Sequence, residues 1–471
     1  MSDWVLDELR ALRRGDLPTH GGRTLAYVYD SAVPGLDALA AEAHALASSV
    51  NGLDPTAFPS LLRLENDVVA MASSLLGGSA GTVGTVTSGG TESCLLAVVA
   101  ARDSRPEVRN PTMVVPETVH AAFRKAAHYF GVRLVAVPVD PVTFRADPVG
   151  MAAAISADTV LVVASAPSYA HGVVDPVVEI AAAAAAAGVR CHVDACIGGW
   201  VLPYFARLGV EVPSFDFSVP GVTSVSVDLH KYAYCPKGTS VLLHASADLR
   251  RAQYFASADW PGYTMLNSTT QSTRSGGPLA AAWAVTRHLG DSGYLELARK
   301  ALGATKLILD GIAGIDGLRV LGEPGSTLIA VAADRADLDL FTVADEMRAR
   351  NWYVQPQFAH GASPANLHLT VTAANAGSEA SLVADLDDSV RAALEAGPVP
   401  VAEEVVAAIR ALDPDALTPR EFAGLLAAAG LGGGGAGVLP ERMAPVNALL
   451  AAAGPRLRER LLVEFLGVLY S

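Results

Sequence analysis

Two repeating patterns of hydrophobic and polar positions alternate between about residue 65 and residue 300. Short runs rich in β-branched residues are separated by stretches in which apolar residues recur every three or four positions. Near-continuous apolar strands alternating with helices are typical of a mainly parallel sheet with helices on both faces. The predicted strands are 112–115, 134–137, 159–164, 189–193 and 224–227, and the predicted helices include 64–76, 91–103, 148–155 and 176–187.

The same patterns divide the chain into parts. A helix around 341–350, with strands near 328–332, 353–356 and 367–372, predicts a second, smaller α/β unit. After this unit the chain reads as helices only, interrupted by a glycine-rich tract at 430–437. We expect four parts: an N-terminal segment (1–60), a large domain (61–300), a smaller C-terminal α/β domain (301–396) and a helical tail (397–471).

Composition narrows the class of protein. Hydrophobic residues fill 51% of the 471 positions and charged residues only 17%, which excludes a disordered chain. The net charge is −14 with no basic run, so we expect neither nucleic acid nor an anionic membrane surface as a partner. The longest apolar tract, 180–189, is too short to span a bilayer, and the start lacks a signal-peptide pattern. We expect a cytoplasmic protein with no stable membrane anchor and, because its four cysteines form no CxxC pair, no metal site.

A lysine-bearing segment follows the last predicted strand of the sheet. That strand ends at Asp228 and is followed by His230 and Lys231, and Lys237 lies six positions further on, in a chain that has only five lysines. Ligands bind at the carboxyl edge of open α/β sheets, where a lysine can form a Schiff base with a carbonyl cofactor. Taken alone, the same residues are also explained by ordinary loop polarity.

Two further segments suggest the cofactor pyridoxal 5′-phosphate (PLP). Asp194 ends an apolar strand, where an acid can pair with the pyridine nitrogen of PLP or simply cap a helix. Gly89, Gly90 and Thr91 lead into a helix, where backbone N–H groups and the helix dipole can bind a phosphate. A capped helix start without any ligand also explains this segment, and it matches neither a Walker loop nor GxGxxG.

Two histidines complete the pattern. His120 lies at a strand-to-helix turn, where it could stack on a planar ring or cap the helix. His171 lies in the loop after an apolar strand, where a solvated loop residue is the alternative. Separate structural explanations for all five segments, in this order along the chain, are less economical than one PLP site.

Seven segments, spread in order over about residues 20–375, match one enzyme superfamily. The chain resembles the fold-type-I PLP enzymes of the group II decarboxylase superfamily and, within it, most resembles the sphingosine-1-phosphate lyases. The resemblance implies an α/β fold with a mainly parallel central sheet, a smaller C-terminal α/β domain, and PLP as the cofactor. The matching segments are 51–78, TSGGTESCLLA (87–97), PETVHAAFRKAAHYFG (116–131), SAPSYAHGVVDPV (165–177), HVDACIGGWVLPYF (192–205), VDLHKYAYCPKG (227–238) and STRSGGPLAAAWA (272–284).

The resemblance also implies a role for each site residue. Lys231 would form the Schiff base, Asp194 would hold the pyridine nitrogen, and His120 would stack over the ring. The other implied roles are cofactor binding by Gly90, Thr91 and His230, contact with the substrate phosphate by Tyr29 and Lys237, and a catalytic position near the substrate for His171. Family members share their active sites across a dimer, so a homodimer is expected.

The implied activity is cleavage of the Cα–Cβ bond of a phosphorylated sphingoid base, giving a fatty aldehyde and phosphoethanolamine. A group II amino-acid decarboxylase would share every cofactor residue and remains the alternative; Lys237 favours the lyase because a decarboxylase does not usually need a second phosphate site. A third interpretation is a PLP-binding scaffold without turnover, which the intact Lys231 and Asp194 disfavour.

Four features depart from the lyase pattern, one of which is WPGYTM (260–265) in place of a Gly-Gly-aromatic pattern. Asp54 stands where a histidine is usual, Ala233 replaces a glycine, and the loop 271–277 differs from its usual GSRxGG form. An acid beside a phosphate is unfavourable, so we expect that either this segment has shifted or the ligand differs.

Overall fold

The computed structural model describes residues 3–428 and 440–470, and the chain forms two compact units. Unit 1 comprises Met1–Leu307, Leu321–Ile329 and Thr370–Gly377, and unit 2 comprises Ile308–Val320, Ala330–Leu369 and Ser378–Ser471. The predicted glycine-rich interruption at 430–437 lies outside the described residues.

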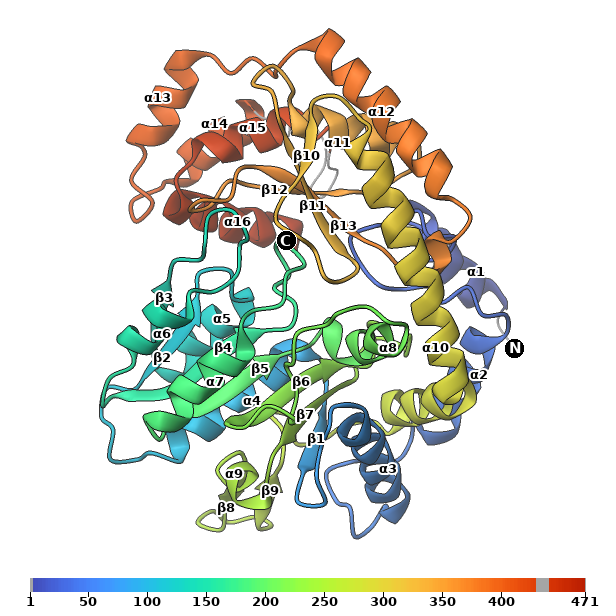
Figure 1. Ribbon diagram of the computed structural model, residues 1–471, viewed down its shortest axis with the longest axis vertical. Coiled ribbons are helices and arrows are strands. Elements are labelled where there is room, and N and C mark those ends of the chain that lie inside the picture. Colours follow the sequence, from blue (N-terminus) through green and yellow to red (C-terminus); the bar gives the residue numbers. More distant parts are fainter. Residues whose placement is uncertain (1–2, 429–439, 471) are drawn as a thin grey trace. The chain divides into compact units, whose positions relative to one another are not determined.

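Unit 1 is built on a seven-stranded sheet with the order β1-β7-β6-β5-β4-β2-β3 (Figure 1). Only β7 runs antiparallel to its neighbours, so six strands point the same way. All five predicted strands are present, which confirms the α/β class, whereas β1 and β7 were not predicted. The strands are β1 Val83–Thr87, β2 Thr112–Pro116, β3 Arg133–Val137, β4 Thr159–Ser165, β5 Arg190–Asp194, β6 Val222–Asp228 and β7 Ser240–His244.

Helices cover both faces of this sheet because its strands are apolar on both sides. Met113 and Val115 of β2 pack in one cluster with residues of α4 and α5, whereas Val114 between them belongs to the cluster that contains residues of α3, α6 and α7. This alternation is the period of two expected for strands. The helices are α3 Pro59–Leu75, α4 Gly90–Asp103, α5 Ala121–Phe130, α6 Pro148–Ala154 and α7 Val177–Ala186.

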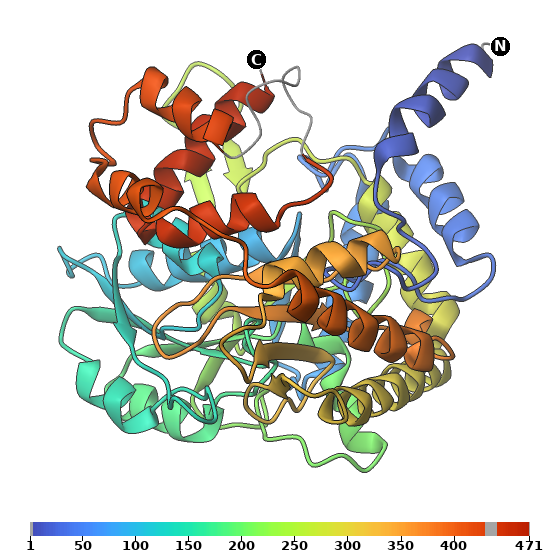
Figure 2. The same cartoon turned by 90° about the horizontal axis from the view of Figure 1, so that it is seen from above.

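The other elements of unit 1 surround the sheet. Helix α10 contains a break at Gly290, whose φ is 55°. Helix α1 (dark blue) projects from the rest of unit 1 in Figure 2 and exposes apolar side chains, among them Trp4 and Leu12. The remaining elements are α1 Asp3–Leu12, η1 Arg13–Gly15, α2 Leu36–Ala47, η2 Gly198–Trp200, α8 Leu202–Arg207, α9 Ala247–Arg251, β8 Phe255–Ser257, β9 Met265–Asn267, α10 Gly277–Ala313, whose last turns lie in unit 2, and η3 Ala373–Asn375.

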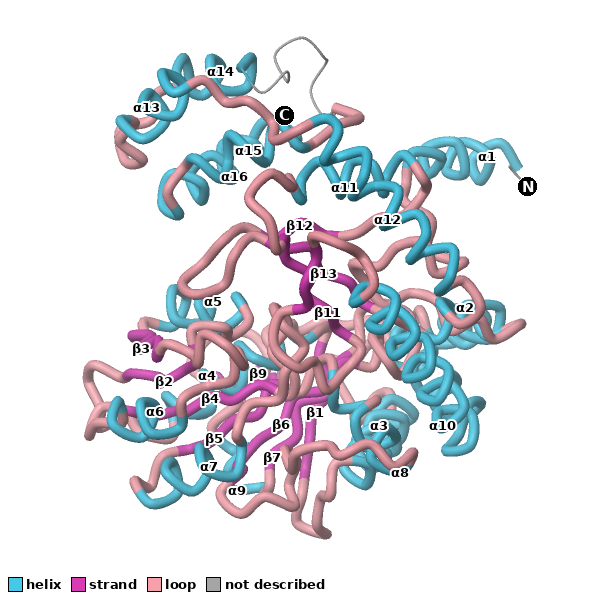
Figure 3. The backbone as a smooth tube through the Cα atoms, turned by 45° about the horizontal axis from the view of Figure 1, so that its top comes forward, coloured by secondary structure: helices cyan, strands magenta, loops and turns pink. Residues whose placement is uncertain are grey.

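Most of unit 2 is a four-stranded sheet, β10-β11-β13-β12, with a group of helices that Figure 3 shows in cyan. The tail helices share a small core formed by Ile409, Ala453 and Leu457. The Asp345 carboxylate accepts the backbone N–H groups of Met443 and Ala444, both at 2.8 Å, which anchors the tail to α11. The elements are β10 Leu318–Val320, β11 Leu328–Ala333, α11 Leu340–Ala349, β12 Gln355–Gln357, β13 Asn366–Thr370, α12 Glu379–Ala396, α13 Glu403–Ala411, α14 Pro419–Ala428, α15 Ala444–Ala452 and α16 Pro455–Leu469.

Among the described residues, no helix has both the length and the hydropathy needed to cross a bilayer.

Candidate active site

The carboxyl ends of the parallel strands bring the predicted site residues to one edge of the unit 1 sheet. Asp194, at the end of β5, is in register with Ser165 of β4 and Ser226 of β6. Asp228, at the end of β6, is in register with Ser240 of β7, which in turn is in register with Thr87 at the end of β1. The loop before α4 and the lysine-bearing loop after β6 therefore start from the same edge, where open α/β sheets bind ligands.

The loop before α4 packs closely on the end of β6. A Cβ atom at Gly90 would lie 2.7 Å from both carboxylate oxygens of Asp228 and 2.8 Å from Cys196 Sγ, so only glycine fits here. Glu92, in the first turn of α4, accepts the Ser88 N–H at 2.6 Å and the Thr270 N–H at 2.9 Å. These contacts fix a helix N-terminus of the kind that binds phosphate.

Gly90→Ala is expected to weaken PLP binding by at least about tenfold, because the added methyl group must displace Asp228 or Cys196. Titration of the apoprotein with PLP, followed by intrinsic fluorescence, measures the change. Gly303→Ala is the matched control, since a Cβ at that helical glycine meets nothing within 4 Å. Equal PLP affinity in the two variants would contradict the assignment of this loop.

Lys231 is held by an ion pair. Its Nζ lies 2.9 Å from Asp228 Oδ2, and both side chains are largely buried. Burial is the largest single influence on the pKa of Lys231 and lowers it, but the charge of Asp228, the hydrogen bond to it and the nearby Cys196 and Asp194 together raise the pKa above the ordinary lysine value. Burial likewise raises the pKa of Asp228, yet the charges of Lys231 and His230 bring it below its ordinary value. Without a carbonyl partner, Lys231 is therefore an ammonium ion, and Asp228 is the acceptor nearest to its proton.

Asp194 lies beside two thiols at the same edge. Among the described residues, the ligand atoms of Cys94, Asp194 and Cys196 lie within 4.8 Å of one another. A hydrogen bond with Cys94, together with burial, raises the pKa of Cys196 well above its ordinary value, so this thiol stays protonated. Asp194 Oδ1 accepts the Cys196 N–H at 3.1 Å, which fixes the carboxylate at the end of β5.

Of the two roles predicted for His120, stacking on a ring and capping a helix, the structure shows the cap. It caps α5, with Nδ1 accepting the Ala122 N–H at 3.2 Å, so its other ring nitrogen carries the proton. Its exposed ring also meets Tyr169 edge-on, with 6.3 Å between ring centroids. The cap fixes the ring without covering it, and stacking on the cofactor remains a prediction.

His171 is buried and stacks on Phe144, with ring centroids 4.1 Å apart and planes 13° apart. Burial lowers the pKa of His171 to about 4, so the imidazole is neutral near pH 7 and can accept a proton. The alternative of a solvated loop residue is wrong, because the side chain is only 2% exposed. The structure does not place a substrate against it, so its catalytic role remains a prediction.

Lys237 and Tyr29, which lie far apart in the sequence, are brought together. Lys237 Nζ donates to the carbonyl oxygens of Val28, at 2.5 Å, and of His230, at 2.9 Å, and lies 4.3 Å from the centroid of the Tyr29 ring. Desolvation and the nearby Lys231 charge lower the pKa of Lys237 to about 8. His230 Cε1 in turn lies 3.7 Å from the Cβ position of Gly89. Lys237 Nζ is therefore held on the backbone of His230, whose ring contacts the candidate phosphate loop.

Asp54, the main departure from the lyase pattern, is used locally. Its Oδ1 accepts hydrogen bonds from Thr56 N, at 2.9 Å, Thr56 Oγ1, at 2.6 Å, and Ala57 N, at 3.1 Å. These bonds lower the pKa of this exposed carboxyl, beginning with the Thr56 hydroxyl. Asp54 therefore closes its own turn, as Asp commonly does.

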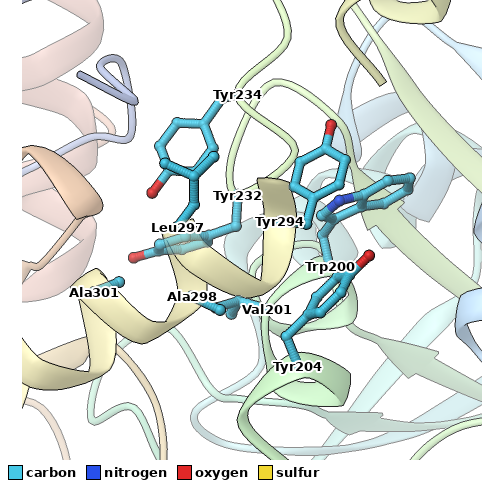
Figure 4. Close-up of a pocket in the computed structure, with 9 residues that line it drawn as sticks. All are labelled: Trp200, Val201, Tyr204, Tyr232, Tyr234, Tyr294, Leu297, Ala298 and Ala301. Carbon is cyan, nitrogen blue, oxygen red and sulfur yellow. The ribbon is translucent and has the colours of Figure 1, made fainter. Parts of the chain in front are cut away.

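An aromatic pocket lies behind the lysine-bearing loop (Figure 4). Tyr232 and Tyr234 enter it from that loop; the Tyr232 hydroxyl donates to Val371 O at 2.7 Å, and the Tyr234 hydroxyl accepts the Ala373 N–H at 3.1 Å. Tyr294, from α10, donates to Ala233 O at 2.9 Å. These bonds brace the loop that holds Lys231, and none of the predicted site residues lines the pocket.

Four residues of this site were not predicted from the sequence. Asp228 was noted only as a strand end, although its place three residues before Lys231 was a usable signal. Glu92, Phe144 and Tyr169 act through contacts with segments distant in the sequence, so no local pattern could have indicated them.

These residues fit PLP. The Gly90 loop and the start of α4 suit its phosphate, Lys231 suits its carbonyl and Asp194 suits its pyridine nitrogen. Residues 19–332 match the family model "Pyridoxal-dependent decarboxylase conserved domain". The chain belongs to this family. Residues 388–468 match a second model, "Pyridoxal-dependent enzyme, C-terminal putative HTH domain", which covers most of the tail helices.

Within the pyridoxal-dependent decarboxylase family, the chain is similar to sphingosine-1-phosphate lyases. It is 41% identical to the enzyme of Dictyostelium discoideum over 74% of this chain and 65% of that protein, and 37% identical to the enzyme of Oryza sativa over 85% and 75%. The solved sphingosine-1-phosphate lyase of Burkholderia pseudomallei superposes with a TM-score of 0.78 at 37% identity, covering 83% of this chain and 91% of that one. These findings confirm the resemblance, the fold-type-I architecture and the PLP cofactor, and they support a carbon–carbon lyase.

Proposed function

We propose that the protein cleaves the Cα–Cβ bond of a phosphorylated sphingoid base to a fatty aldehyde and phosphoethanolamine. The observation that carries this proposal is the position of Lys237 beside Tyr29 and the backbone of His230. The N-terminus of α4 already provides a site for the cofactor phosphate, so the Lys237 ammonium is suited to bind a second anion. A phosphorylated substrate supplies that anion.

Each site residue has a separate role in such a reaction. When bound, PLP supplies a carbonyl that takes up the substrate amine and a ring that withdraws electrons from the substrate Cα. Lys237 binds the substrate phosphate as a fixed charge, and this remote binding energy orients the bond that breaks. The neutral imidazole of His171 accepts the proton of the substrate hydroxyl. Asp228 Oδ2 fixes Lys231 Nζ through an ion pair at 2.9 Å, and the amine acts as the nucleophile once it has lost its proton.

Product analysis tests this proposal. The PLP-loaded protein is incubated with sphinganine-1-phosphate, and aldehyde and phosphoethanolamine are measured by mass spectrometry. Unphosphorylated sphinganine is the matched control, and its kcat/KM is expected to be about 10–100-fold lower because it lacks the charge-assisted bonds to Lys237. Carbon dioxide release from amino acids, without any aldehyde, would instead support the decarboxylase alternative.

We also propose that the protein is a cytoplasmic homodimer in which the two chains share their active sites. Catalytic residues at subunit boundaries, as implied by the family resemblance, support this arrangement. A solution mass near twice 48.6 kDa by light scattering is expected, and a monomer with full activity would contradict it. Cell fractionation tests the location.

A further inference from the structure

A row of buried polar side chains lies along β5 and β6, starting from Asp194 at the carboxyl edge of the unit 1 sheet. In the parallel pair β5–β6, His192 is in register with Ser224, and Asp194 is in register with Ser226. Side chains two positions apart point to the same face of a strand, so all four lie on one face. None is more than 7% exposed. Their alignment follows from the strand register.

The four side chains form one chain of hydrogen bonds. His192 Nδ1 lies 2.9 Å from Ser224 Oγ, and His192 Nε2 lies 3.2 Å from Ser226 Oγ. Ser226 Oγ donates to Asp194 Oδ1 through a longer bond of 3.5 Å. The Cys196 thiol also donates to Ser226 Oγ, at 3.3 Å. Ser226 is thus the link between the imidazole and the carboxylate.

The direction of these bonds follows from the number of protons available. Ser226 has one hydroxyl proton, and donating it to Asp194 requires its oxygen to accept the bond from His192. His192 Nε2 must then carry the imidazole proton, and Nδ1 accepts from the Ser224 hydroxyl. Every dipole in the row therefore points its positive end towards Asp194, which stabilises the ionised carboxylate.

Burial keeps the His192 imidazole in its neutral form. Burial lowers the pKa of His192 to about 4 although the Asp194 charge opposes the shift, so the imidazole carries no charge near pH 7. The Phe123 ring covers it, with 5.8 Å between ring centroids. His192 therefore acts on Asp194 as an oriented dipole, without a competing positive charge.

We propose that His192, acting through Ser226, is a positioning residue that holds Asp194 ionised and turned so that its other oxygen can meet the pyridine nitrogen of PLP. Both hydrogen bonds that the structure gives Asp194 end on Oδ1, which leaves Oδ2 for the cofactor. The inference rests on the assignment of Asp194 to that nitrogen. Through Asp194, the pair of His192 and Ser226 would also influence how strongly the bound cofactor withdraws electrons.

The test compares PLP binding in matched variants. Ser226→Ala and His192→Leu are expected to raise the PLP dissociation constant about tenfold, which corresponds to one lost bond to a charged group. Both variants should also shift the pH-dependent absorbance change of the bound cofactor, raising its midpoint by about one pH unit. The reason is that a less protonated pyridine ring withdraws electrons less strongly. His192→Gln keeps an N–H donor near Nε2 and should stay within about twofold of the parent protein.

Two controls make the outcome decisive. His368→Leu removes a buried histidine of the four-stranded sheet of unit 2 and should leave PLP affinity unchanged. Asp194→Asn should weaken PLP binding at least as much as Ser226→Ala. If Asp194→Asn is strongly impaired while Ser226→Ala and His192→Leu match His368→Leu, the proposal is overturned and the Asp194 assignment stands. If Asp194→Asn also binds PLP normally, both are overturned.

A second readout does not need the cofactor. Nitrogen-15 NMR of the apoprotein, labelled at histidine and assigned with the His192→Gln variant, reports which ring nitrogen carries the proton. We expect His192 to be the Nε2–H tautomer and not to titrate between pH 6 and 9. The Nδ1–H tautomer would overturn the proposal, because Ser226 would then give its proton to His192 and not to Asp194.

Discussion

Lys231→Ala is expected to lower kcat by more than about a thousandfold, as the loss of a covalent nucleophile does in other enzymes. The Lys231 amine is the group positioned to bond the cofactor, with Nζ held 2.9 Å from Asp228 Oδ2. Borohydride reduction followed by peptide mapping provides the structural readout. It should attach the cofactor to the peptide containing Lys231 in the parent protein and not in the variant.

The control for this experiment is Lys125→Ala. Lys125 lies over the exposed ring of Tyr129 on α5, at 5.4 Å from its centroid, so its loss should leave both kcat and cofactor attachment unchanged. Lys231→Ala should retain some PLP affinity, because the Gly90 loop and Asp194 remain. A Lys231→Ala variant that turned over substrate at the parent rate would instead support a PLP-binding scaffold whose activity lies elsewhere.

Lys237→Ala is expected to lower kcat/KM for the phosphorylated substrate by about 10–100-fold, because it removes a charge-assisted bond. The unphosphorylated substrate should lose much less, since it makes no such bond. Steady-state kinetics with both substrates gives the comparison. An equal loss for both would show that Lys237 only holds Val28 and His230 in place.

The pH dependence gives a second signature for Lys237. Because its pKa is lowered to about 8, the ammonium is present below pH 8 and is lost as the pH rises through that value. kcat/KM reports the free enzyme, so for the phosphorylated substrate it should fall above pH 8. Lys237→Arg keeps its charge to far higher pH and should remove this fall. A fall that persists in Lys237→Arg would assign it to another group.

The sequence predicts the sheet where each strand is a continuous apolar run, as in β4 and β5, because such runs need both faces covered. The sequence does not predict β1, which precedes the glycine loop, or β7, which follows the lysine-bearing loop. The glycine and lysine motifs are interpreted as loops, so the adjoining strands are not recognised. The sequence also indicates that Asp194, Gly90 and Lys231 lie at the carboxyl edge of the unit 1 sheet, since these residues end or follow strands. The row from His192 to Asp194 could not be predicted, because it depends on the register of β5 with β6, which a single chain pattern does not encode.

The same limit explains His171, whereas Asp54 differs from its prediction for a local reason. An isolated acid in place of a histidine suggested a conflict with phosphate, but the structure shows a turn closed by Thr56 and Ala57. Nothing near His171 in the sequence indicates the Phe144 ring, which comes from another loop. A contact between segments distant in the sequence decides the case of His171, whereas bonds within its own turn decide that of Asp54.

The most direct test of the account is product analysis in D2O with sphinganine-1-phosphate and the PLP-loaded protein. Cleavage of the Cα–Cβ bond leaves a Cα that takes its new hydrogen from solvent. We expect fatty aldehyde without deuterium and an equal amount of phosphoethanolamine with one deuterium on its amine-bearing carbon, both absent with Lys231→Ala. Release of carbon dioxide from an amino acid by this protein, with no aldehyde from the phosphorylated base, would contradict it.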